Sequence, residues 1–280
     1  MEKICDIHVH SYYSDGTCAP GELIRLAEAA GLSAVALCDH NTVGGLPEFL
    51  AAAEGSTVEA VPGIEFSTEY QGTELHILGL FIKPEAYPLI HEQMEAALRR
   101  KEQSNLDLVA RLREAGLPLD YHKIREEASG SVNRAVIAAH MVKLGICESV
   151  QEAFDCWLSP KCGYYVPPVL SDSLEIIRFI KSIGAAAVLA HPFLNLDEAG
   201  LRAFLPEAVA CGLDGMEVLY PKFTPEQTVL AQKIAEEFGI LSSGGSDFHG
   251  DNKPDIAMGT GRGNLVIPLE FLEQLRKRIG

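Results

Sequence analysis

Short apolar segments alternate with helix-like segments along most of this 280-residue chain, and this alternation restricts the fold more than any other feature. Short apolar runs bounded by turn residues fit buried strands, and the amphipathic stretches between them fit helices. Repeated strand–helix alternation is typical of a parallel sheet covered by helices. A chain of this length can form a single α/β barrel. We therefore predict an α/β fold with a parallel, barrel-like sheet.

Seven strands and six helices make up this alternating pattern. Strands are predicted at residues 4–9, 34–38, 58–61, 75–81, 185–190, 215–219 and 240–243. Helices are predicted at residues 20–30, 47–54, 172–182, 199–211, 225–238 and 269–279. Residues 85–168 contain no good strand and show helical patterning instead, with helices expected near 98–112, 121–128, 134–144 and 149–157. We predict a barrel domain from residues 1–84 and 169–280, interrupted by a helical subdomain at 85–168.

Histidines and carboxylates gather at the ends of the predicted strands. Alternate side chains of a strand share one face, so His8 and His10 should project to the same side, roughly 6.5 Å apart. Two imidazoles at that spacing can bind one metal ion, although an isolated pair fits surface histidines equally well. The carboxyl ends of barrel strands meet at one mouth, so further ligands there favour a metal cluster. The candidate ligands are His8, His10, Asp15, His40, Glu65, His76, His191, Asp247 and His249.

Composition excludes several other classes of protein. The formal net charge of −16 at pH 7 disfavours binding to a long nucleic acid, because a polyanion would be repelled. A small anionic substrate remains compatible, since bound divalent cations can reverse the local charge of a site. The seven cysteines form no CxxC pair and fit reduced thiols. No long apolar run occurs, so we expect a cytoplasmic protein without membrane association or an obligate protein partner.

In their order along the chain, these motifs resemble those of the PHP family, the polymerase and histidinol phosphatase superfamily. The resemblance implies a distorted seven-stranded (β/α)7 barrel that holds two to three divalent transition metals, Mn, Zn or Fe. Mixed imidazole and carboxylate ligands agree with such ions and disfavour the all-oxygen sites of calcium. The matching stretches are Asp6–His10, Ser14–Gly16, Cys38–Thr42, Gly63–Glu65, His76, Ala190–Pro192 and Ser246–His249.

By motif position, the resemblance divides the ligands among three metals. The first metal would be held by His8, His10, Glu65 and Asp247, and the second by Asp15, His40 and His249. Glu65 would bridge to a third metal, completed by His76 and His191. Asp15 stands where some relatives have histidine. The resemblance also implies catalytic roles for Asp15, His40, Glu65, His191, Asp247 and His249.

The insertion carries two candidate phosphate contacts. Residues 129–134 end a loop and open a helix, where backbone N–H groups, the helix dipole and the Arg134 guanidinium can converge on an anion. A subgroup of PHP phosphoesterases similar to this chain inserts a helical domain with a Gly-x-Arg element and a later lysine loop, which bind substrate phosphate. Arg134 and Lys161 occupy the matching places, so the resemblance makes 85–168 a substrate-binding subdomain. Ala135 and Val136 stand where that subgroup usually has Pro-His.

The resemblance predicts a metal-dependent phosphoesterase that hydrolyses a phosphate monoester of a small metabolite by attack of a metal-bridging hydroxide. A nucleoside 3′,5′-bisphosphate is the favoured substrate, with Arg134 and Lys161 holding the second phosphate. The alternatives are a histidinol-phosphate-type phosphatase, a 5′-to-3′ exonuclease on short oligonucleotides, and a non-catalytic metal-stabilised scaffold. The complete ligand set argues against the scaffold.

Several remaining polar and aromatic residues are predicted to have supporting or structural roles. Asp39 is expected to orient His40 without binding metal itself. The Gly259–Gly263 segment lacks the spacing and the strand–turn–helix context of a dinucleotide-binding loop. Tyr164 and Tyr165 fit packing at the edge of the subdomain better than base stacking, because no basic groove accompanies them. Structural or exposed positions are also expected for His91, His122 and His140.

Overall fold

The computed structural model describes residues 3–128 and 132–279. The chain divides into two compact units, which are described separately: unit 1 comprises Met1–His91 and Leu170–Gly280, and unit 2 comprises Glu92–Val169. All seven cysteines are free thiols. Within the described ranges, no helix is both long and apolar enough to cross a membrane.

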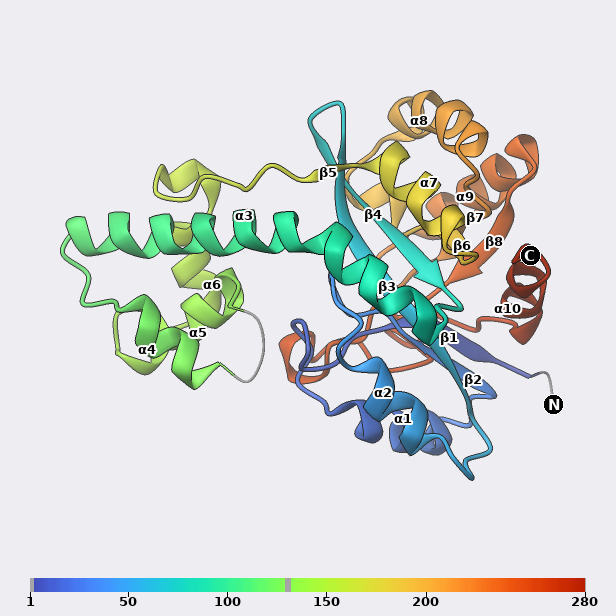
Figure 1. The fold of residues 1–280 in the computed structure, drawn as a ribbon, viewed down its shortest axis with the longest axis horizontal. Coiled ribbons are helices and arrows are strands. Elements are labelled where there is room, and N and C mark those ends of the chain that lie inside the picture. Colours follow the sequence, from blue (N-terminus) through green and yellow to red (C-terminus); the bar gives the residue numbers. More distant parts are fainter. Residues whose placement is uncertain (1–2, 129–131, 280) are drawn as a thin grey trace. The chain divides into compact units, whose positions relative to one another are not determined.

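Unit 1 is built on a curled sheet with the strand order β1-β2-β3-β4-β6-β7-β8 (Figure 1). Two hydrogen bonds join its ends, because His10 N donates to Phe248 O at 2.9 Å and Asp247 N donates to His8 O at 2.9 Å. The result is the distorted seven-stranded barrel that the sequence predicted. The strands are β1 (Cys5–Val9), β2 (Ala34–Leu37), β3 (Glu59–Tyr70), β4 (Thr73–Leu80), β6 (Ala186–Leu189), β7 (Gly215–Leu219) and β8 (Leu241–Gly244), with the short β5 (Ser171–Asp172) paired to β3.

The prediction of an all-parallel sheet is wrong at β4, which runs antiparallel to both β3 and β6. Gln71 and Gly72 join β3 to β4 directly, with φ values of 51° and 82°. Positive φ at both positions is the geometry of a two-residue hairpin turn, which reverses the chain. Strand β3 therefore continues to Tyr70, well beyond the predicted end at residue 61. Because of the reversal, the start of β4, where His76 lies, is next to the carboxyl ends of the parallel strands.

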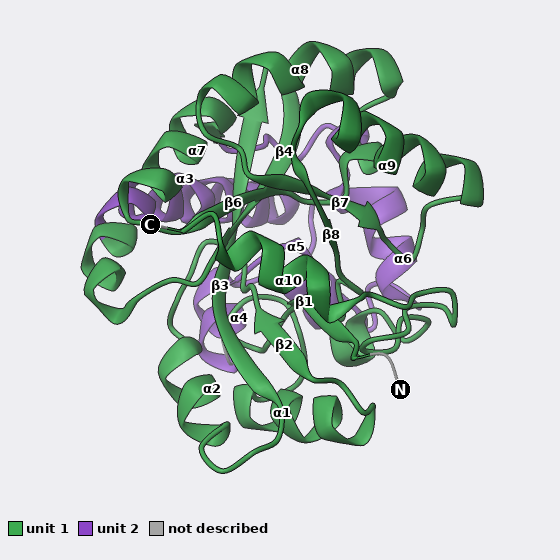
Figure 2. Ribbon diagram, turned by 90° about the vertical axis from the view of Figure 1, so that its right-hand side faces the viewer, with its two compact units in different colours: residues 1–91, 170–280 green, residues 92–169 purple. Residues whose placement is uncertain are grey.

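Helices surround the strands of unit 1, and α10 lies across the end of the barrel that faces the viewer in Figure 2. Helix α9 begins at the Thr224 capping box with Gln227 and ends at Gly239, whose φ of 67° suits a left-handed C-cap. The helices are α1 (Pro20–Ala29), α2 (Leu46–Ala52), α7 (Ser173–Ser182), α8 (Glu198–Ala210), α9 (Pro225–Phe238) and α10 (Leu269–Arg276), with short 3₁₀ turns at Pro84–Ala86, Pro192–Leu194 and Gly250–Asn252.

The barrel interior changes from apolar to polar along the strands. Ala186, Val188 and other small buried residues pack with Leu272 and Leu275 of α10 in one hydrophobic cluster. Side chains two positions apart share a face of a strand, so the next interior position after Val61 and Gly63 on β3 is Glu65. The apolar layer closes one end of the barrel, and the ionisable side chains are left at the carboxyl end.

Unit 2 is helical and has its own apolar core, which includes Leu108, Leu112, Ile137 and Met141. Asp120, Asn133 and Ser149 cap its helices by accepting hydrogen bonds from backbone N–H groups in the first turn. Its elements are most of α3 (Tyr87–Glu114), α4 (Tyr121–Glu127), α5 (Arg134–Lys143), α6 (Val150–Ala153), a π-helical turn at Phe154–Leu158 and a 3₁₀ turn at Pro160–Cys162.

Candidate metal centre

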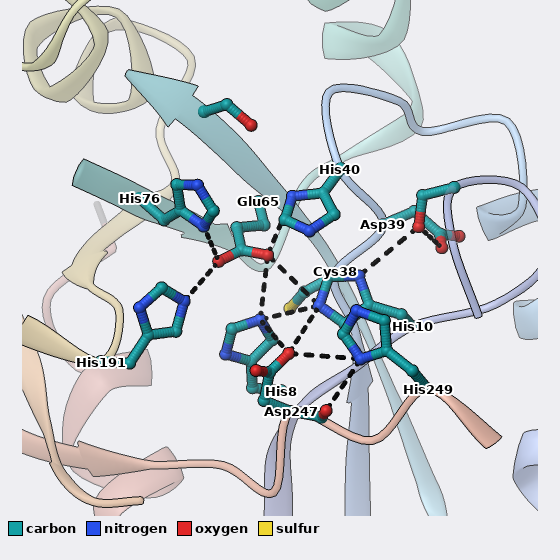
Figure 3. A network of polar contacts seen from close by, with 12 residues as sticks. His8, His10, Cys38, Asp39, His40, Glu65, His76, His191, Asp247 and His249 are labelled. Carbon is teal, nitrogen blue, oxygen red and sulfur yellow. Dashed lines mark hydrogen bonds and ion pairs between the residues drawn. The ribbon is translucent and has the colours of Figure 1, made fainter. Parts of the chain in front are cut away.

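The nine candidate ligands from the sequence lie together at the carboxyl end of the unit 1 barrel, and Figure 3 shows the side chains that it labels pointing toward one another around Glu65. Three sets have ligand atoms that all lie within 4.8 Å of one another: His10, Asp15, His40 and His249; His8, His10 and Glu65; and His40, Glu65 and His76. His8, His10 and Asp15 come from β1 and the loop after it, His40 follows β2, Glu65 and His76 lie in β3 and β4, His191 follows β6, and Asp247 and His249 follow β8.

Strand β1 brings His8 and His10 to the same side, as the alternation predicted, with their Nε2 atoms 2.9 Å apart. The pairing register with β2 shifts between Asp6 and Val9, which is the signature of a bulge that re-aims side chains. Gly245 makes room for His8, because a Cβ at Gly245 would lie 2.2 Å from the Cβ of His8. A side chain at position 245 would therefore displace this candidate ligand.

Glu65 is the centre of the cluster. Its Oε2 atom lies 3.2 Å from His8 Nε2, 3.2 Å from His10 Nε2 and 3.1 Å from His40 Nδ1. Among the described residues, neither this buried oxygen nor His40 Nδ1 has a hydrogen-bond partner. Buried polar atoms without hydrogen bonds are costly, and a shared cation satisfies several at once. This donor set fits a divalent metal ion, and its mixture of imidazoles and carboxylate suits Zn, Mn or Fe.

The other oxygen of Glu65 contacts two further histidines. Its Oε1 atom lies 2.8 Å from His76 Nδ1 and 3.0 Å from His191 Nε2. The remaining nitrogen of His76 lies 3.2 Å from Glu74 Oε1, which orients the ring. One buried carboxylate thus lies within contact distance of five imidazoles, an arrangement suited to bridging two metal ions.

Asp15 and His249 form the edge of the cluster nearest the loop after β1. His249 Nε2 lies 3.1 Å from Asp15 Oδ1, and His40 Nε2 lies 3.7 Å from Asp15 Oδ2. His10 Nδ1 is also 3.7 Å from Asp15 Oδ1. The Asp15 carboxylate therefore lies among the candidate ligands and can supply oxygen donors.

Asp247 is held by two residues that the sequence analysis did not identify. Its Oδ2 atom accepts hydrogen bonds from Tyr220 Oη at 2.8 Å and from Lys253 Nζ at 2.6 Å. Its Oδ1 atom faces His10 Nε2 at 3.3 Å and His249 Nδ1 at 3.4 Å. With Oδ2 occupied by two donors, Oδ1 is the oxygen left for a metal.

Glu217, in the middle of β7, is a third residue that the sequence analysis missed. It is completely buried, and its carboxylate lies 3.0 Å from His8 Nδ1. The only available signal was a lone glutamate in the apolar segment Gly-Met-Glu-Val-Leu, since glutamate is almost never buried without a partner.

The prediction that Asp39 orients His40 is wrong. The Asp39 carboxylate accepts hydrogen bonds from Ser11 N at 2.8 Å, Ser11 Oγ at 2.6 Å and Ser14 Oγ at 2.7 Å. Successive side chains of an extended segment point to opposite sides, so Asp39 and His40 diverge. Asp39 stabilises the loop between His10 and Asp15 instead.

The backbone is strained at several positions of the cluster. His191 and Asp247 have φ values of 29° and 54°, and Asn41, next to His40, has φ of 55°. A non-glycine residue in such a region costs about 1–3 kcal/mol and persists only where surrounding contacts enforce it. Strain at three strand ends that carry candidate ligands agrees with selection of these positions for function.

Protons compensate the carboxylates of the cluster when no metal is bound. Burial acts to lower the pKa of His10, but hydrogen bonds with Asp247 and Glu65 outweigh it and raise the pKa to about 9. Burial also opposes protonation of His76, yet the Glu65 charge raises its pKa to about 10. In the same way, the charges of Glu65 and Glu217 outweigh burial and raise the pKa of His8 well above its ordinary value. The carboxylates of the cluster therefore favour the protonated form of these three imidazoles.

A pocket of about 220 Å³ opens onto the cluster from unit 1. Two lysines, Lys222 and Lys253, and three carboxylates line it, so an anion can approach once cations balance the carboxylates. The lining residues are His40, Glu65, Glu74, His76, His191, Leu194, Asn195, Tyr220, Lys222, Asp247 and Lys253.

The two candidate phosphate contacts lie in unit 2. The Arg134 guanidinium carbon is 4.2 Å from the centre of the Tyr165 ring, and its Nη1 atom donates to Leu158 O at 3.5 Å. Lys161 is exposed in the 3₁₀ turn after the π-helical segment. Ser129, Gly130 and Ser131, which the sequence analysis placed in an anion-binding loop, lie outside the described residues.

The remaining histidines have local contacts in the helical part of the chain. His140 is buried and lies 3.1 Å from Glu127, while the backbone of His122 donates to the Asp120 cap. His91 is exposed. Gly259, outside the helical part, donates its N–H to the buried carboxylate of Asp6 at 2.7 Å, so its loop is anchored to β1.

The chain is similar to known proteins in both sequence and fold. A family model described as PHP domain matches residues 6–152. A crystal structure of a protein from Bifidobacterium adolescentis, described as a metal-dependent phosphoesterase, matches with a TM-score of 0.87 at 27% identity and covers 99% of this chain and 97% of that one.

Three curated relatives have different stated activities. A 5′-3′ exoribonuclease of Haemophilus influenzae is 32% identical over 250 residues, which cover 89% of this chain and 91% of the relative. A phosphoribosyl 1,2-cyclic phosphate 1,2-diphosphodiesterase of Eggerthella lenta is 30% identical over 254 residues (88% and 94%). A 3′,5′-nucleoside bisphosphate phosphatase of Chromobacterium violaceum is 28% identical over 247 residues (87% and 86%). All three stated activities break a bond to phosphate.

Proposed function

The chain belongs to the PHP domain family, and we propose that it removes the 3′-phosphate from nucleoside 3′,5′-bisphosphates. Membership makes it a metal-dependent phosphoesterase, and its His, Asp and Glu clusters are able to bind metals. The choice among phosphate esters is the proposal. It draws support from one relative that acts on such bisphosphates and from the small pocket in unit 1.

The observation that carries the chemistry is the sharing of Glu65 by five imidazoles. We propose that His8, His10, Glu65 and Asp247 hold one ion, that Asp15, His40 and His249 hold a second, and that His76 and His191 complete a third with Glu65. Divalent ions bound there lower the pKa of a water molecule and neutralise charge on phosphoryl oxygens. None of the candidate ligands needs to attack the substrate itself.

The protein residues supply binding and orientation. Tyr220 and Lys253 hold Oδ2 of Asp247, which leaves Oδ1 directed at the histidines. Lys222 in the pocket offers a positive charge to a dianionic phosphate, and bound cations would balance the carboxylates there. Its volume suits a phosphoryl group with part of a small leaving group, because pockets for drug-sized ligands are larger, at about 300–1,000 Å³.

For the second phosphate we propose Arg134 and Lys161 of unit 2. The Arg134 guanidinium lies against the Tyr165 ring, and this stacking orients its planar set of N–H donors. A preoriented guanidinium loses less entropy when it binds phosphate with two hydrogen bonds. Lys161, which is exposed, offers a second positive charge in the same unit.

A second candidate function is 5′-to-3′ exonuclease activity on short oligonucleotides. The exoribonuclease relative has higher identity to this chain than the bisphosphate phosphatase does, 32% against 28%. We rank it second because the net charge of −16 opposes binding of a polyanion. Phosphatases of histidinol-phosphate type and a non-catalytic scaffold rank below both.

The test is a panel of phosphate esters assayed after reconstitution with Mn, Zn or Fe. The panel contains a nucleoside 3′,5′-bisphosphate, histidinol phosphate, a ribose cyclic phosphate and a 5′-phosphorylated RNA trinucleotide, with Asp247→Ala protein as the blank. We expect the highest kcat/KM with the bisphosphate. Faster turnover of the trinucleotide would favour the exonuclease, and turnover of histidinol phosphate alone would overturn the assignment.

A further inference from the structure

Glu217 occupies a position that the catalytic proposal leaves unexplained. It lies in β7 between the buried residues Met216 and Val218, and its own side chain is completely buried. Its two oxygens have separate partners: Oε1 lies 3.0 Å from His8 Nδ1, and Oε2 accepts the backbone N–H of His191 at 2.6 Å. The carboxylate therefore joins β1 to the segment after β6 directly beneath the metal-ligand cluster.

When His8 binds a metal, Glu217 must accept a hydrogen bond in both contacts. His8 directs Nε2 toward His10 and Glu65, so this nitrogen is the one placed to bind metal and must carry a lone pair. A neutral imidazole with an Nε2 lone pair carries its proton on Nδ1 and donates it to Glu217. The backbone N–H of His191 can only donate. An ionised carboxylate is the side chain that accepts both hydrogens.

The second contact fixes a strained ligand. His191 has φ of 29° and ψ of 55°, and its Nε2 atom lies 3.0 Å from Glu65 Oε1. Figure 3 shows His8 and His191 on the same side of the cluster, below Glu65. One carboxylate thus sets the protonated nitrogen of His8 and anchors the backbone of His191, and both histidines contact Glu65.

We propose that Glu217 is a positioning residue of the metal centre, which holds His8 in the metal-binding tautomer and His191 in its ligand conformation. This inference rests on the ligand set proposed above. It assigns to Glu217 a role in metal affinity that is separate from its role in packing.

Replacement of Glu217 by glutamine separates these two roles. Glutamine has nearly the same shape but offers one acceptor oxygen and one NH₂ donor. If the oxygen accepts the His191 N–H, the NH₂ faces His8 Nδ1, which must then accept and move its proton to Nε2. That tautomer cannot bind a metal through Nε2. The buried core of β7 is otherwise kept.

The experiment measures Zn²⁺ affinity by competition with a chromophoric chelator for wild type, Glu217→Gln and a control, Asp214→Asn. Asp214 lies three residues earlier, where its carboxylate accepts the Ala187 N–H at 2.9 Å and pairs with Lys181 at 2.6 Å. The control removes a charge that also contacts the β6 backbone but touches no candidate ligand. We expect Glu217→Gln to weaken the tightest Zn²⁺ site about 10- to 100-fold, as for other residues that orient metal-binding histidines, and Asp214→Asn to change it less than about threefold.

A double-mutant cycle with His8→Ala tests whether Glu217→Gln acts through His8 or only by removing a negative charge near the cluster. If Glu217 acts mainly through His8, the cost of Glu217→Gln on the remaining Zn²⁺ sites should fall below about threefold in the His8→Ala background. Melting temperatures of the metal-free proteins report folding separately. Equal Zn²⁺ affinity of wild type and Glu217→Gln, or an undiminished loss in the His8→Ala background, would overturn the role of Glu217. Wild-type protein that binds no Zn²⁺ would instead overturn the ligand set itself.

Discussion

The two units of the molecule both have apolar cores, but they differ in how many ionisable groups they bury. At the carboxyl end of its barrel, unit 1 buries ionisable groups, including His8, His10, Glu65 and Asp247. Unit 2 buries mainly aliphatic side chains such as Leu112 and Ile137, and its buried His140 pairs with a single glutamate, Glu127. Buried charges are costly unless they are paired or coordinate a metal, whereas buried aliphatic groups stabilise a fold unaided. Metal binding should therefore be a property of unit 1 alone, and changes in unit 2 should alter other properties.

The largest expected difference is between substitution of Asp247, a buried candidate ligand in unit 1, and substitution of His122 in unit 2. Asp247→Ala removes the Oδ1 atom that faces His10 and His249, so it should reduce metal content and lower kcat/KM by about 10³-fold or more, equal to about 4 kcal/mol. His122→Ala, in unit 2, should change neither, because its cap contact uses the backbone N–H. Elemental analysis and steady-state kinetics on the same preparations provide the measurement. Similar behaviour of the two variants would contradict the contrast between the units.

The pH dependence of metal binding tests the charge of the unit 1 cluster. His10 and His76 have pKa values of about 9 and about 10 without metal, so both are protonated at pH 7. Metal must displace these protons, and its affinity should rise roughly tenfold per pH unit for each proton released. Isothermal titration of metal-free protein in buffers of different ionisation enthalpy counts the protons. Binding without proton release would show that these histidines are not ligands.

The same pKa values set the stability of the metal-free protein. Because these folded pKa values lie above the ordinary histidine value of about 6.5, the stabilisation is complete below that pH and is lost as pH rises through about 9 to 10. Melting temperature should therefore fall between pH 7 and pH 10 in chelator and fall less with bound metal. A metal-free protein that became more stable over this range would contradict the sign.

A smaller effect is expected from Arg134 in unit 2. Arg134→Ala should lower kcat/KM for nucleoside bisphosphates by roughly 10- to 100-fold, as expected for losing about 1.5–3 kcal/mol of charge-assisted hydrogen bonding. Hydrolysis of p-nitrophenyl phosphate should hardly change, since it has no second phosphate, and metal content should be intact. The kcat/KM of Arg134→Lys, which keeps the charge but not the planar donors, should lie between those of wild type and Arg134→Ala. Equal losses on both substrates would exclude a remote phosphate contact.

The smallest effect concerns a helix cap in unit 2. Asp120 accepts the backbone N–H of His122 at 2.9 Å, and Asp120→Ala should lower the stability slightly because the first turn of α4 loses its cap. Denaturant unfolding measures this cost, while chelator competition should give a metal affinity equal to that of wild type. A drop in metal affinity would show that the stability of unit 2 and metal binding in unit 1 are coupled.

Local features of this protein could be predicted from its amino-acid sequence alone. Helix α9 was predicted with its observed bounds, because Pro225, the cap at Thr224 and Gly239 are signals carried within the helix or beside it. His8 and His10 were predicted on one side of a strand because the alternation of side chains is a property of the extended backbone. The gathering of candidate ligands followed from the rule that strand ends meet at one mouth of a barrel.

The pairing of residues that are distant in sequence depends on the folded barrel. The reversal at Gln71-Gly72 turned β4 antiparallel, and Asp39 paired with Ser11 and Ser14 rather than with its neighbour His40. Glu217 reaches His8 across 209 positions of the chain, a contact that no local pattern encodes. Periodicity and caps reflect energies within a few residues, whereas these contacts depend on how strands distant in sequence pack. The residue types of the candidate metal centre could therefore be predicted from the sequence. The hydrogen bonds that orient these residues depend on how the barrel packs.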